Sequence, residues 1–543
     1  MMRFLKVFLL SAGVVLAQTA SKDACTPPPG SVPPPLPAKL LEGQGRIDFP
    51  ITIAGARAQA FFNQGVAQMH SFWSREAERS FLEAAALDPA APMPHWGIAM
   101  VAAGDFRPGF QLDLVKGLNP KPRPARKPEG GLARAVAAAR KALELSKVDG
   151  AATRLEKLYI AAVAARRDLA AKDPNAGYVA GLRALVAEYP NQVEAASYLS
   201  LHIMSGYTTP DRKPFPGSAE AVSILRRLLA AAPDHAGVHH YVIHGWEGSS
   251  FAAEAWPSSK RYPELAPNIP HALHMPGHIY SQTGRWQDAG RAFDDAAANE
   301  ILWMKQDTLA GNQHHGHNVH YLATVRSFNG QYEKAIAAAK SLLEFKETPR
   351  EAASLTSHRT AYRQGWFALM RTLVQHQRWD EILDGKTLPN LNIPRQRAWS
   401  HWAMALAYAD RGDLPSAKSE ARKMDAALEE EKVKTKQRTA EQMKLAREEL
   451  KGHLALASGD VNKAMALLRK AAEMEPRLRY NEPPLYPRPV YDALGQIALR
   501  QGNLALAESS YRKALKLYPE GAASNAGLRD VLQRQGKPLP AGM

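Results

Sequence analysis

Six stretches of this 543-residue chain repeat one arrangement of small and large residues at fixed spacings. The clearest stretch lies near the end and has two glycines followed by alanine, a large aromatic residue, alanine and proline: Gly495, Gly502, Ala507, Tyr511, Ala514 and Pro519. Gly65, Gly277 and Gly452 begin the same register, and Gly330 and Gly412 begin shorter matches to it. Because the positions are fixed jointly, the pattern predicts an internal repeat.

The reasons for this spacing are steric. Small residues on the first helix of a unit allow close approach of the second helix, and a proline ends that second helix before the next unit begins. Successive units are not equally spaced, since Gly284 and Gly330 lie 46 residues apart. We therefore expect an all-α, right-handed superhelical solenoid of helix pairs. Some of its helices, such as those over 428–450, should be long and exposed, and a capping helix is predicted from Ala522 to Gln535.

The N-terminus reads as a secretory signal. Arg3 and Lys6 precede an apolar stretch from Val7 to Ala17, which is too short for a membrane anchor. We therefore expect an exported protein, periplasmic or secreted, with no transmembrane segment after cleavage. The predicted organisation is a signal peptide, a Pro-rich linker, N-terminal repeats, His-rich repeats and C-terminal repeats with the capping helix, at 1–17, 18–48, 49–233, 234–346 and 347–543.

Composition narrows the function further. The net charge of +16 is spread along the chain, and its densest basic patch, 121–127, is Pro-rich and has no aromatic residues. Nucleic-acid binding is not expected from such a patch. Cys25 is the only cysteine, which excludes a disulfide and a thiolate-rich metal site. The chain also lacks a phosphate-binding glycine loop, a nucleophile elbow and an H-E-x-x-H motif.

Histidines are concentrated in the middle of the chain, where 11 of the 18 fall between His235 and His320. In the repeat register seven of them occupy position 2, 5 or 9 of three successive first helices. These positions share one helix face, which lines the concave groove of a repeat array. Position 5 is histidine in all three: His240, His274 and His320. Because packed helices lie about 8–10 Å apart, these imidazoles are expected to converge on one ion.

Neutral imidazole suits a divalent transition metal such as Zn, Cu or Fe. The sequence therefore predicts a metal site in this groove, with these histidines as candidate ligands: His235, His240, His244, His271, His274, His278, His317 and His320. Glu247, one turn after His244, is a candidate ligand or general base. The alternative is that these histidines are metal-free polar groups, hydrogen-bonded between helices or lining a groove for an anionic ligand or peptide.

Other histidines are expected to have different roles. His239, His314 and His315 lie off the register and are assigned to surface or loop, whereas His70 and His95 are given structural roles. Pro276 interrupts the expected helix beside the histidines. It predicts either a kink there or a helix that starts later than the register indicates.

Several blocks resemble a family of bacterial exported or cytosolic tetratricopeptide-repeat proteins. The specific ones are HAGVHHYVIHGWEGS, HALHMPGHIYSQTGRW, HNVHYL and YNEPPLYPRPVYDALGQ, and the resemblance covers nearly the whole chain after the signal. It implies a shared pocket of the central histidines and Glu247, closed by Glu482. This chain departs from the family at Ser74, where a histidine is usual, and at Leu485-Tyr486, where Asp-Trp is usual. The family carries no activity to transfer.

Three functions are compatible with these residues. The first is an exported binding or scaffold protein whose histidine-lined groove takes a protein or peptide and holds a metal. The second is a metal-dependent enzyme, a hydrolase or oxidoreductase, in which the histidines hold the ion, Glu247 acts as ligand or base, and an open coordination position takes water or a small-molecule substrate. The third is a metal-free peptide-docking module.

Overall fold

The chain folds into a solenoid of antiparallel helix pairs. The computed structural model describes residues 37–106, 129–306, 314–345 and 360–540, so the predicted signal peptide and Cys25 lie outside the described residues. Within that part, the first helices are α1 (Ala56–His70), α2 (Ser74–Leu87), α3 (Pro92–Val101), α4 (Gly130–Leu145), α5 (Arg154–Arg167), α6 (Pro174–Glu188), α7 (Val193–Ile203) and α8 (Pro216–Ala231).

The middle helices are α9 (Ala236–Trp246), η2 (Ala252–Ala255), α10 (Trp256–Leu265), α11 (Pro270–Gln282), α12 (Trp286–Gln306), α13 (His315–Phe328) and α14 (Tyr332–Glu344). The last helices are α16 (Ala361–Gln375), α17 (Trp379–Leu383), α18 (Pro394–Asp410), α19 (Leu414–Thr435), α20 (Glu441–Ala457), α21 (Val461–Met474), η3 (Glu475–Arg477), α22 (Val490–Arg500), α23 (Leu504–Leu517) and α24 (Ala522–Arg534). The capping helix is α24, as expected.

The repeat register is explained by direct contacts between the two helices of a unit. A Cβ added at Gly65 would lie 2.6 Å from the ring of Phe81, and one added at Gly277 would lie 2.5 Å from the ring of Phe293. The equivalent glycine in α20, Gly452, faces Leu468 at 2.6 Å. Glycine at this position therefore leaves room for the large side chain of the second helix. The expected solenoid of helix pairs is confirmed.

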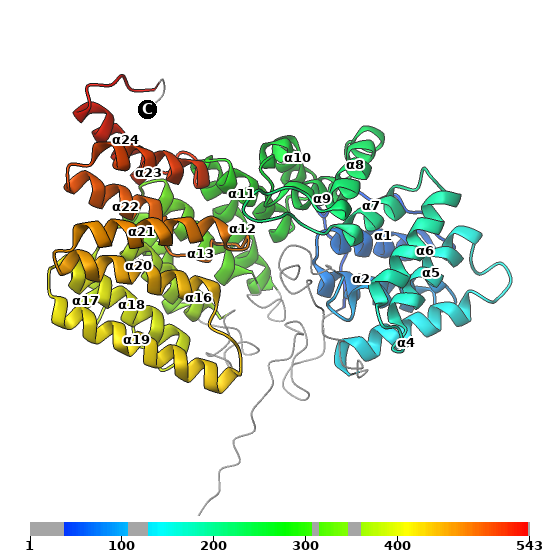
Figure 1. Ribbon diagram of the computed structural model, residues 1–543. Helices are drawn as coiled ribbons and strands as arrows, with labels where there is room; N and C mark the ends of the chain where they lie inside the picture. Colours follow the sequence, from blue (N-terminus) through cyan, green and yellow to red (C-terminus); the bar gives the residue numbers. More distant parts are fainter. Residues whose placement is uncertain (1–36, 107–128, 307–313, 346–359, 541–543) are drawn as a thin grey trace, which may run out of the picture.

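Helices α9–α13 lie between two lobes, formed by α1–α8 on one side and by α16–α24 on the other (Figure 1). Two large clusters of buried apolar residues form the core. One spans Ile47 to Ile279 and the other Trp286 to Ala514. The histidine-bearing helices α9, α11 and α13 therefore lie where the two halves of the core meet.

The C-terminal repeat folds back onto the middle of the chain. The Trp286 indole N–H donates to the carbonyl oxygen of Pro519 at 2.8 Å. The Phe328 ring stacks between Trp286 and Tyr518, with centroid distances of 4.7 and 4.9 Å. α11–α13 are consequently held from two sides, by their neighbours in sequence and by the end of the chain.

Residues 37–48 are the described part of the Pro-rich linker expected over 18–48. This segment has no helix, and it packs along α1 and the loop between α10 and α11. The Leu41 backbone N–H donates to Gln64, Gln44 is 4% exposed, and Asn268 donates its side-chain amide to the Glu42 carbonyl. Proline content carried no information on these long-range hydrogen bonds.

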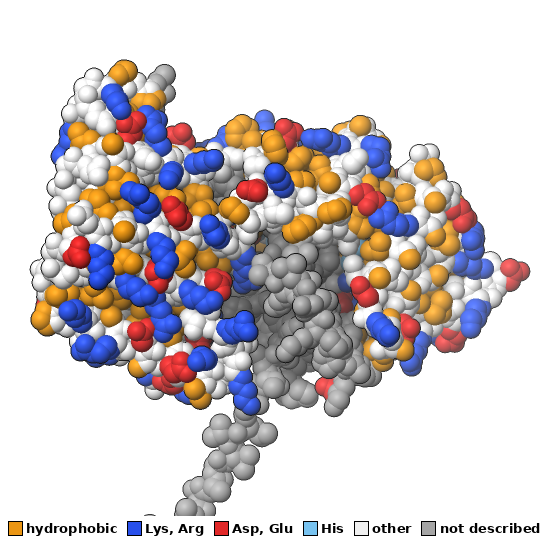
Figure 2. Space-filling view, in the orientation of Figure 1, with side chains coloured by type: hydrophobic (Ala, Val, Ile, Leu, Met, Phe, Trp, Pro, Cys, Tyr) orange, Lys and Arg blue, Asp and Glu red, His pale blue; other side chains and the backbone are white. Residues whose placement is uncertain are grey.

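Two expectations about the surface can be compared with the described residues. Lys and Arg side chains are interspersed with Asp and Glu over both halves of the face in Figure 2. None of the helices in the described ranges combines the length and hydropathy that crossing a bilayer requires.

Candidate metal centre

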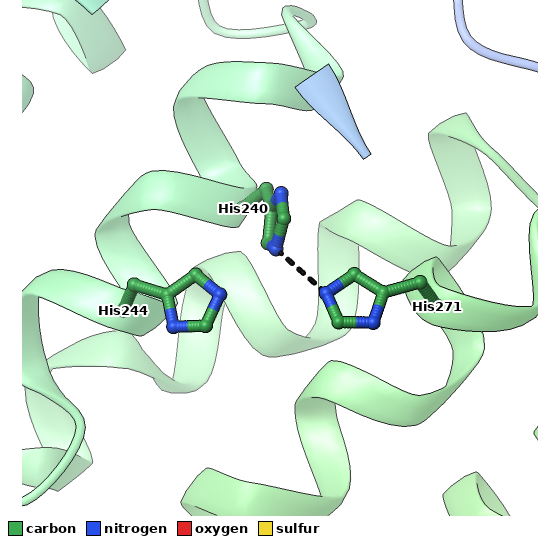
Figure 3. A group of neighbouring side chains, drawn as sticks. All are labelled: His240, His244 and His271. Atoms are coloured by element: carbon green, nitrogen blue, oxygen red, sulfur yellow. Dashed lines mark hydrogen bonds between the residues drawn. The ribbon is translucent and has the colours of Figure 1, made fainter. Parts of the chain in front are cut away.

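The first group of histidines, which we call the first triad, consists of His240 and His244 on α9 and His271 on α11. Each offers a ligand atom within 4.8 Å of those of the other two, and the three rings turn toward one space between the helices (Figure 3). A triangle of that size places its centre within about 2.8 Å of each corner. Small ring rotations then bring the nitrogens to the ~2.0–2.1 Å of a Zn–N bond.

Hydrogen bonds fix the state of His240. Its Nδ1 lies 2.6 Å from the backbone carbonyl oxygen of His70, and because a carbonyl only accepts, Nδ1 carries the proton. The other nitrogen, Nε2, lies 3.2 Å from Nε2 of His271. Two ligands of a tetrahedral ion at ~2.0–2.1 Å stand about 3.3 Å apart. The separation of these two nitrogens therefore matches one edge of such a site.

The second triad consists of His274 and His278 on α11 and His317 on α13, again with ligand atoms within 4.8 Å of one another. The centroids of the His274 and His278 rings are 4.3 Å apart, and those of His274 and His317 are 5.0 Å apart. Nδ1 of His274 and Nε2 of His278 are buried and have no hydrogen-bond partner among the described residues. Buried imidazole nitrogens of this kind are suited to accepting a metal ion.

α11 delivers histidines to both triads because the helix continues through Pro276. It begins at Pro270, as the register predicts, so the alternative of a later start is wrong. Pro276 and Gly277 are both buried, and Gly277 lets α11 approach Phe293 of α12. His271, His274 and His278 therefore share one face of α11.

Glu247 connects the triads. It immediately follows α9 and is 1% exposed. Its Oε2 accepts from His244 Nδ1 at 2.8 Å, and its Oε1 accepts from His278 Nδ1 at 2.5 Å. A carboxylate on Nδ1 fixes the tautomer and leaves Nε2 to bind metal, which is how metal-bound histidines are usually held. Glu247 is thus placed as a positioning residue for both triads, with both oxygens on histidines.

A second carboxylate, Glu482, enters from the loop between η3 and α22 and lies 2.8 Å from His278 Nδ1. The hydroxyl of Tyr480 donates to Glu482. The same hydroxyl accepts from Gln282 Nε2 at 2.8 Å. Glu247, His278 and Glu482 form a third compact group of ligand atoms. The sequence-based expectation that Glu482 closes the pocket agrees with this placement.

Burial and charge set the protonation of the pocket. Burial, reinforced by neighbouring imidazoles, lowers the pKa of both His271 and His274 well below its ordinary value, so both are neutral donors at pH 7. Burial also lowers the pKa of His278, but the carboxylates of Glu482 and Glu247 outweigh it and raise that pKa to about 9. Burial and the adjacent Glu247 raise the pKa of Glu482 to about 8.

His235 belongs to a different group. Its Nδ1 accepts from the backbone N–H of Val238 at 3.2 Å, which caps α9, and its Nε2 donates to Glu194 Oε1 at 3.0 Å. The other oxygen of Glu194 bonds His70. Both nitrogens of His235 are therefore engaged in hydrogen bonds. The group of His70, Glu194 and His235 supports the first triad from behind, since His70 also accepts from His240.

His320 is not brought together with His240 and His274, contrary to the expected convergence. Its Nδ1 lies 2.6 Å from Gln364 Oε1 on α16, and it belongs to neither triad. The register places position 5 on the inner face, but α13 is flanked by α16. His320 therefore turns toward that neighbour instead of toward α11.

Two histidines assigned to surface or loop are in fact buried. His239 lies inside α9, where its Nδ1 is 3.0 Å from Ser258 Oγ of α10 and its Nε2 donates to the Pro233 carbonyl. His315 begins α13 and packs on Phe345. Both assignments are wrong for the same reason: each histidine is covered by the second helix of its own pair or by the residue after that helix, which periodicity along one helix does not show. His314 is exposed, as expected, and His95 is partly buried in α3.

Comparison with known proteins identifies the repeats themselves. Family models described as tetratricopeptide repeats match residues 449–478 and 489–520. The chain carries tetratricopeptide repeats. No curated protein sequence matches it.

The solved structures that match this chain share little sequence with it. The Cut9 and Hcn1 hetero-tetramer of the APC/C shows 13% identity over 88% of this chain and 90% of that chain, with a TM-score of 0.28. Human IFIT1 in a dimer with PPP-AAAA shows 14% identity over 78% and 92%, with a TM-score of 0.31. Yeast Tom70 shows 12% identity over 89% and 90%, with a TM-score of 0.28.

Sequence reasoning missed three residues of this tetratricopeptide-repeat pocket. Glu194 lies on α7 and has no motif around it. Tyr480 was quoted only as part of a block. Phe72, in the turn after α1, has φ of +56° and covers the first triad, with its ring 4.5 Å from that of His240 and 5.3 Å from that of His244. The left-handed backbone of Phe72 is visible only in the structure, and the sequence offered no signal for it.

Proposed function

We propose that this tetratricopeptide-repeat protein is exported and holds a divalent transition metal among the histidines of α9, α11 and α13. The observation that carries the proposal is the pair of hydrogen bonds from His244 and His278 to Glu247. They point the proton-bearing nitrogen of each ring at a carboxylate and leave the other nitrogen for an ion. Zn, Cu and Fe all accept imidazole ligands.

The space beside these histidines suits an ion or a small molecule better than a docked peptide. The loop after η3 already occupies the pocket, because Glu482 lies 2.8 Å from His278 Nδ1 and the Tyr480 hydroxyl lies 3.4 Å from Glu247 Oε1. Arg371 of α16 anchors that loop by donating to the carbonyl oxygens of Pro484 and Tyr486 at 2.8 and 2.9 Å. A peptide partner of the kind that tetratricopeptide repeats bind would therefore dock on another surface of the solenoid.

The proposal is tested by measuring metal in untagged protein purified after cleavage of the signal. Mass spectrometry is expected to find metal bound to the wild type and lost from a His240→Ala/His274→Ala variant, because one ligand is removed from each triad. The matched control is His320→Ala, which removes an imidazole outside the triads and should retain the metal. If the wild-type protein takes up no metal after reconstitution, the proposal is wrong.

A second candidate function, a metal-dependent hydrolase or oxidoreductase, is favoured by the number of ligands. Each triad supplies three imidazoles, which is the ligand count of catalytic zinc sites that keep a position for water or substrate. In such an enzyme Glu247 would orient histidines and Glu482 would be the carboxylate nearer to the reacting water. Activity against ester or phosphoester substrates that follows metal content would support this function, and its absence would leave binding alone.

A further inference from the structure

We propose that the two triads hold two metal ions as one centre, with Glu247 as the shared positioning residue. This inference rests on the proposed function and deepens it, because it states how many ions are bound and how the two sites are linked. One ion would be bound by His240, His244 and His271, and the other by His274, His278 and His317.

The triads are too close to be independent. His271 and His274 lie one turn apart on α11 and belong to different triads, yet their rings are stacked with centroids 5.6 Å apart. Each triad also takes histidines from two helices, so α11 contributes to both sites at once. Two ions bound there would share one helix and a common wall of imidazole rings.

A carboxylate between the triads offsets part of the charge that two ions bring. Two divalent cations bound by imidazoles alone would leave their charge unbalanced in a buried space, so nearby negative charge is required. Glu247 is placed to supply it, because it bonds one histidine of each triad, and the carboxyl group of Glu482 lies beside it.

The hydrogen bonds of the two triads differ in one respect. His278 Nδ1 lies near both Glu247 and Glu482, at 2.5 and 2.8 Å, and the Glu247 contact of His244 Nδ1 is 2.8 Å long. Removing the Glu247 carboxylate therefore deprives the first triad of its orienting partner, while the second triad keeps Glu482. The structure assigns unequal dependence on Glu247 to the two ions.

Stoichiometry tests the number of ions. The full chain is stripped with chelator, loaded with Zn²⁺, desalted and measured for zinc per chain. We expect two zinc ions in the wild type, one in His240→Ala, one in His274→Ala, and two in the His320→Ala control. One zinc in the wild type overturns the two-ion centre but leaves the proposed function standing, and no zinc overturns both. If His240→Ala and His274→Ala each lose both ions, or each lose neither, the assignment of one ion to each triad is wrong.

A second measurement needs no variant. Electron paramagnetic resonance of wild-type protein loaded with Cu²⁺ is expected to show an isolated-ion spectrum at low loading and dipolar broadening as the second equivalent binds. Two equivalents that give only isolated-ion signals overturn the single-centre arrangement, even if the zinc count is two.

The role of Glu247 is tested with one triad at a time. In a His274→Ala background, where the first triad remains, Glu247→Ala is expected to weaken zinc affinity by roughly 10–100-fold. In a His240→Ala background, where the second triad remains, the same substitution should change affinity little, because Glu482 still bonds His278. Glu247→Gln should restore the first triad, since its amide oxygen accepts from His244. Equal losses in both backgrounds overturn the assigned role.

Discussion

Glu475 is a buried carboxyl group far from the histidines, and its surroundings are those of a neutral acid. It is 5% exposed and accepts from the Val490 backbone N–H and the Tyr518 hydroxyl, both at 2.8 Å. Burial raises its pKa to about 8. This residue joins η3 to the start of α22 and to α23, so its protonation bears on the stability of the C-terminal repeats.

Raising the pH should therefore destabilise the wild type relative to Glu475→Gln. Below about pH 4.3 the carboxyl is protonated in both states; between there and pH 8 the unfolded chain ionises while the folded chain keeps the proton. The free energy of unfolding should fall with pH across that window, by at most ~1.4 kcal/mol per unit. Urea unfolding at pH 5, 6.5 and 8 measures this loss in the wild type.

Glutamine at 475 stays neutral and should lack the loss of stability between pH 5 and 8. The exposed Glu473→Gln is the control and should follow the wild type. Identical pH profiles for all three proteins would show that Glu475 ionises as easily in the fold as in the unfolded chain.

At the residue scale, the sequence predicted which helix face carries the histidines, but it did not predict which residue each histidine contacts. The register placed His240, His244, His271, His274 and His278 on shared helix faces, and the structure groups them in two triads. It could not show that His320 turns to Gln364, because periodicity gives a direction on one helix and says nothing of which neighbour crosses it. The metal-ligand assignments themselves stay predictions.

At the scale of elements, the contact between paired helices is the most sharply defined feature. A methyl group at Gly277 of α11 would meet the Phe293 ring of α12 at 2.5 Å, whereas one at Gly290 of α12 has its nearest neighbour at 4.0 Å. Both glycines lie inside helices. They differ in whether a second helix occupies the space of the missing side chain.

Gly277→Ala is expected to push α11 from α12 and lower stability by about 1–3 kcal/mol, as overpacking does. Because His274 and His278 flank the position, zinc affinity should fall with it. Gly290→Ala is the matched control and should be neutral or stabilising by up to ~1 kcal/mol, since alanine favours helix. Thermal unfolding and zinc titration of both variants give the comparison; equal effects would contradict the packing argument.

The helices themselves were largely predictable from residues at set spacings. Glycine and a large residue indicate where two paired helices touch, and proline indicates where the second helix ends. The segment 37–48 shows where that information stops. Prolines predict a linker over 18–48, but the position of residues 37–48 depends on hydrogen bonds to Gln64 and Asn268, which belong to α1 and to the loop before α11. Hydrogen bonds between segments that are far apart in the chain produce no repeating pattern in the sequence.

For the whole molecule, the return of the C-terminal repeat to the middle of the chain is the main departure from an open solenoid. Phe328 is central to that closure, since it is 5% exposed and stacks on both Trp286 and Tyr518. A chain closed in this way has a contact that an array of nearest-neighbour repeats lacks.

Phe328→Ala should loosen the closure, at a cost of roughly 3–5 kcal/mol for a buried ring. Hydrogen exchange is expected to rise in α23 and α24 while α1–α8 keep the protection of the wild type, because the first hydrophobic cluster does not include Phe328. A uniform rise along the chain would instead mean that the two halves unfold as one cooperative unit.

The placement of Glu482 also bears on when a metal can be acquired. His70 and Glu482 are 412 residues apart in the sequence, and both contact histidines of the triads or their partners. A ribosome must therefore complete nearly the entire chain before the pocket exists. If the chain is threaded unfolded across a membrane, as the proposed export implies, no ion travels with it. The metal would then be selected by the compartment in which folding ends, from the ions available there.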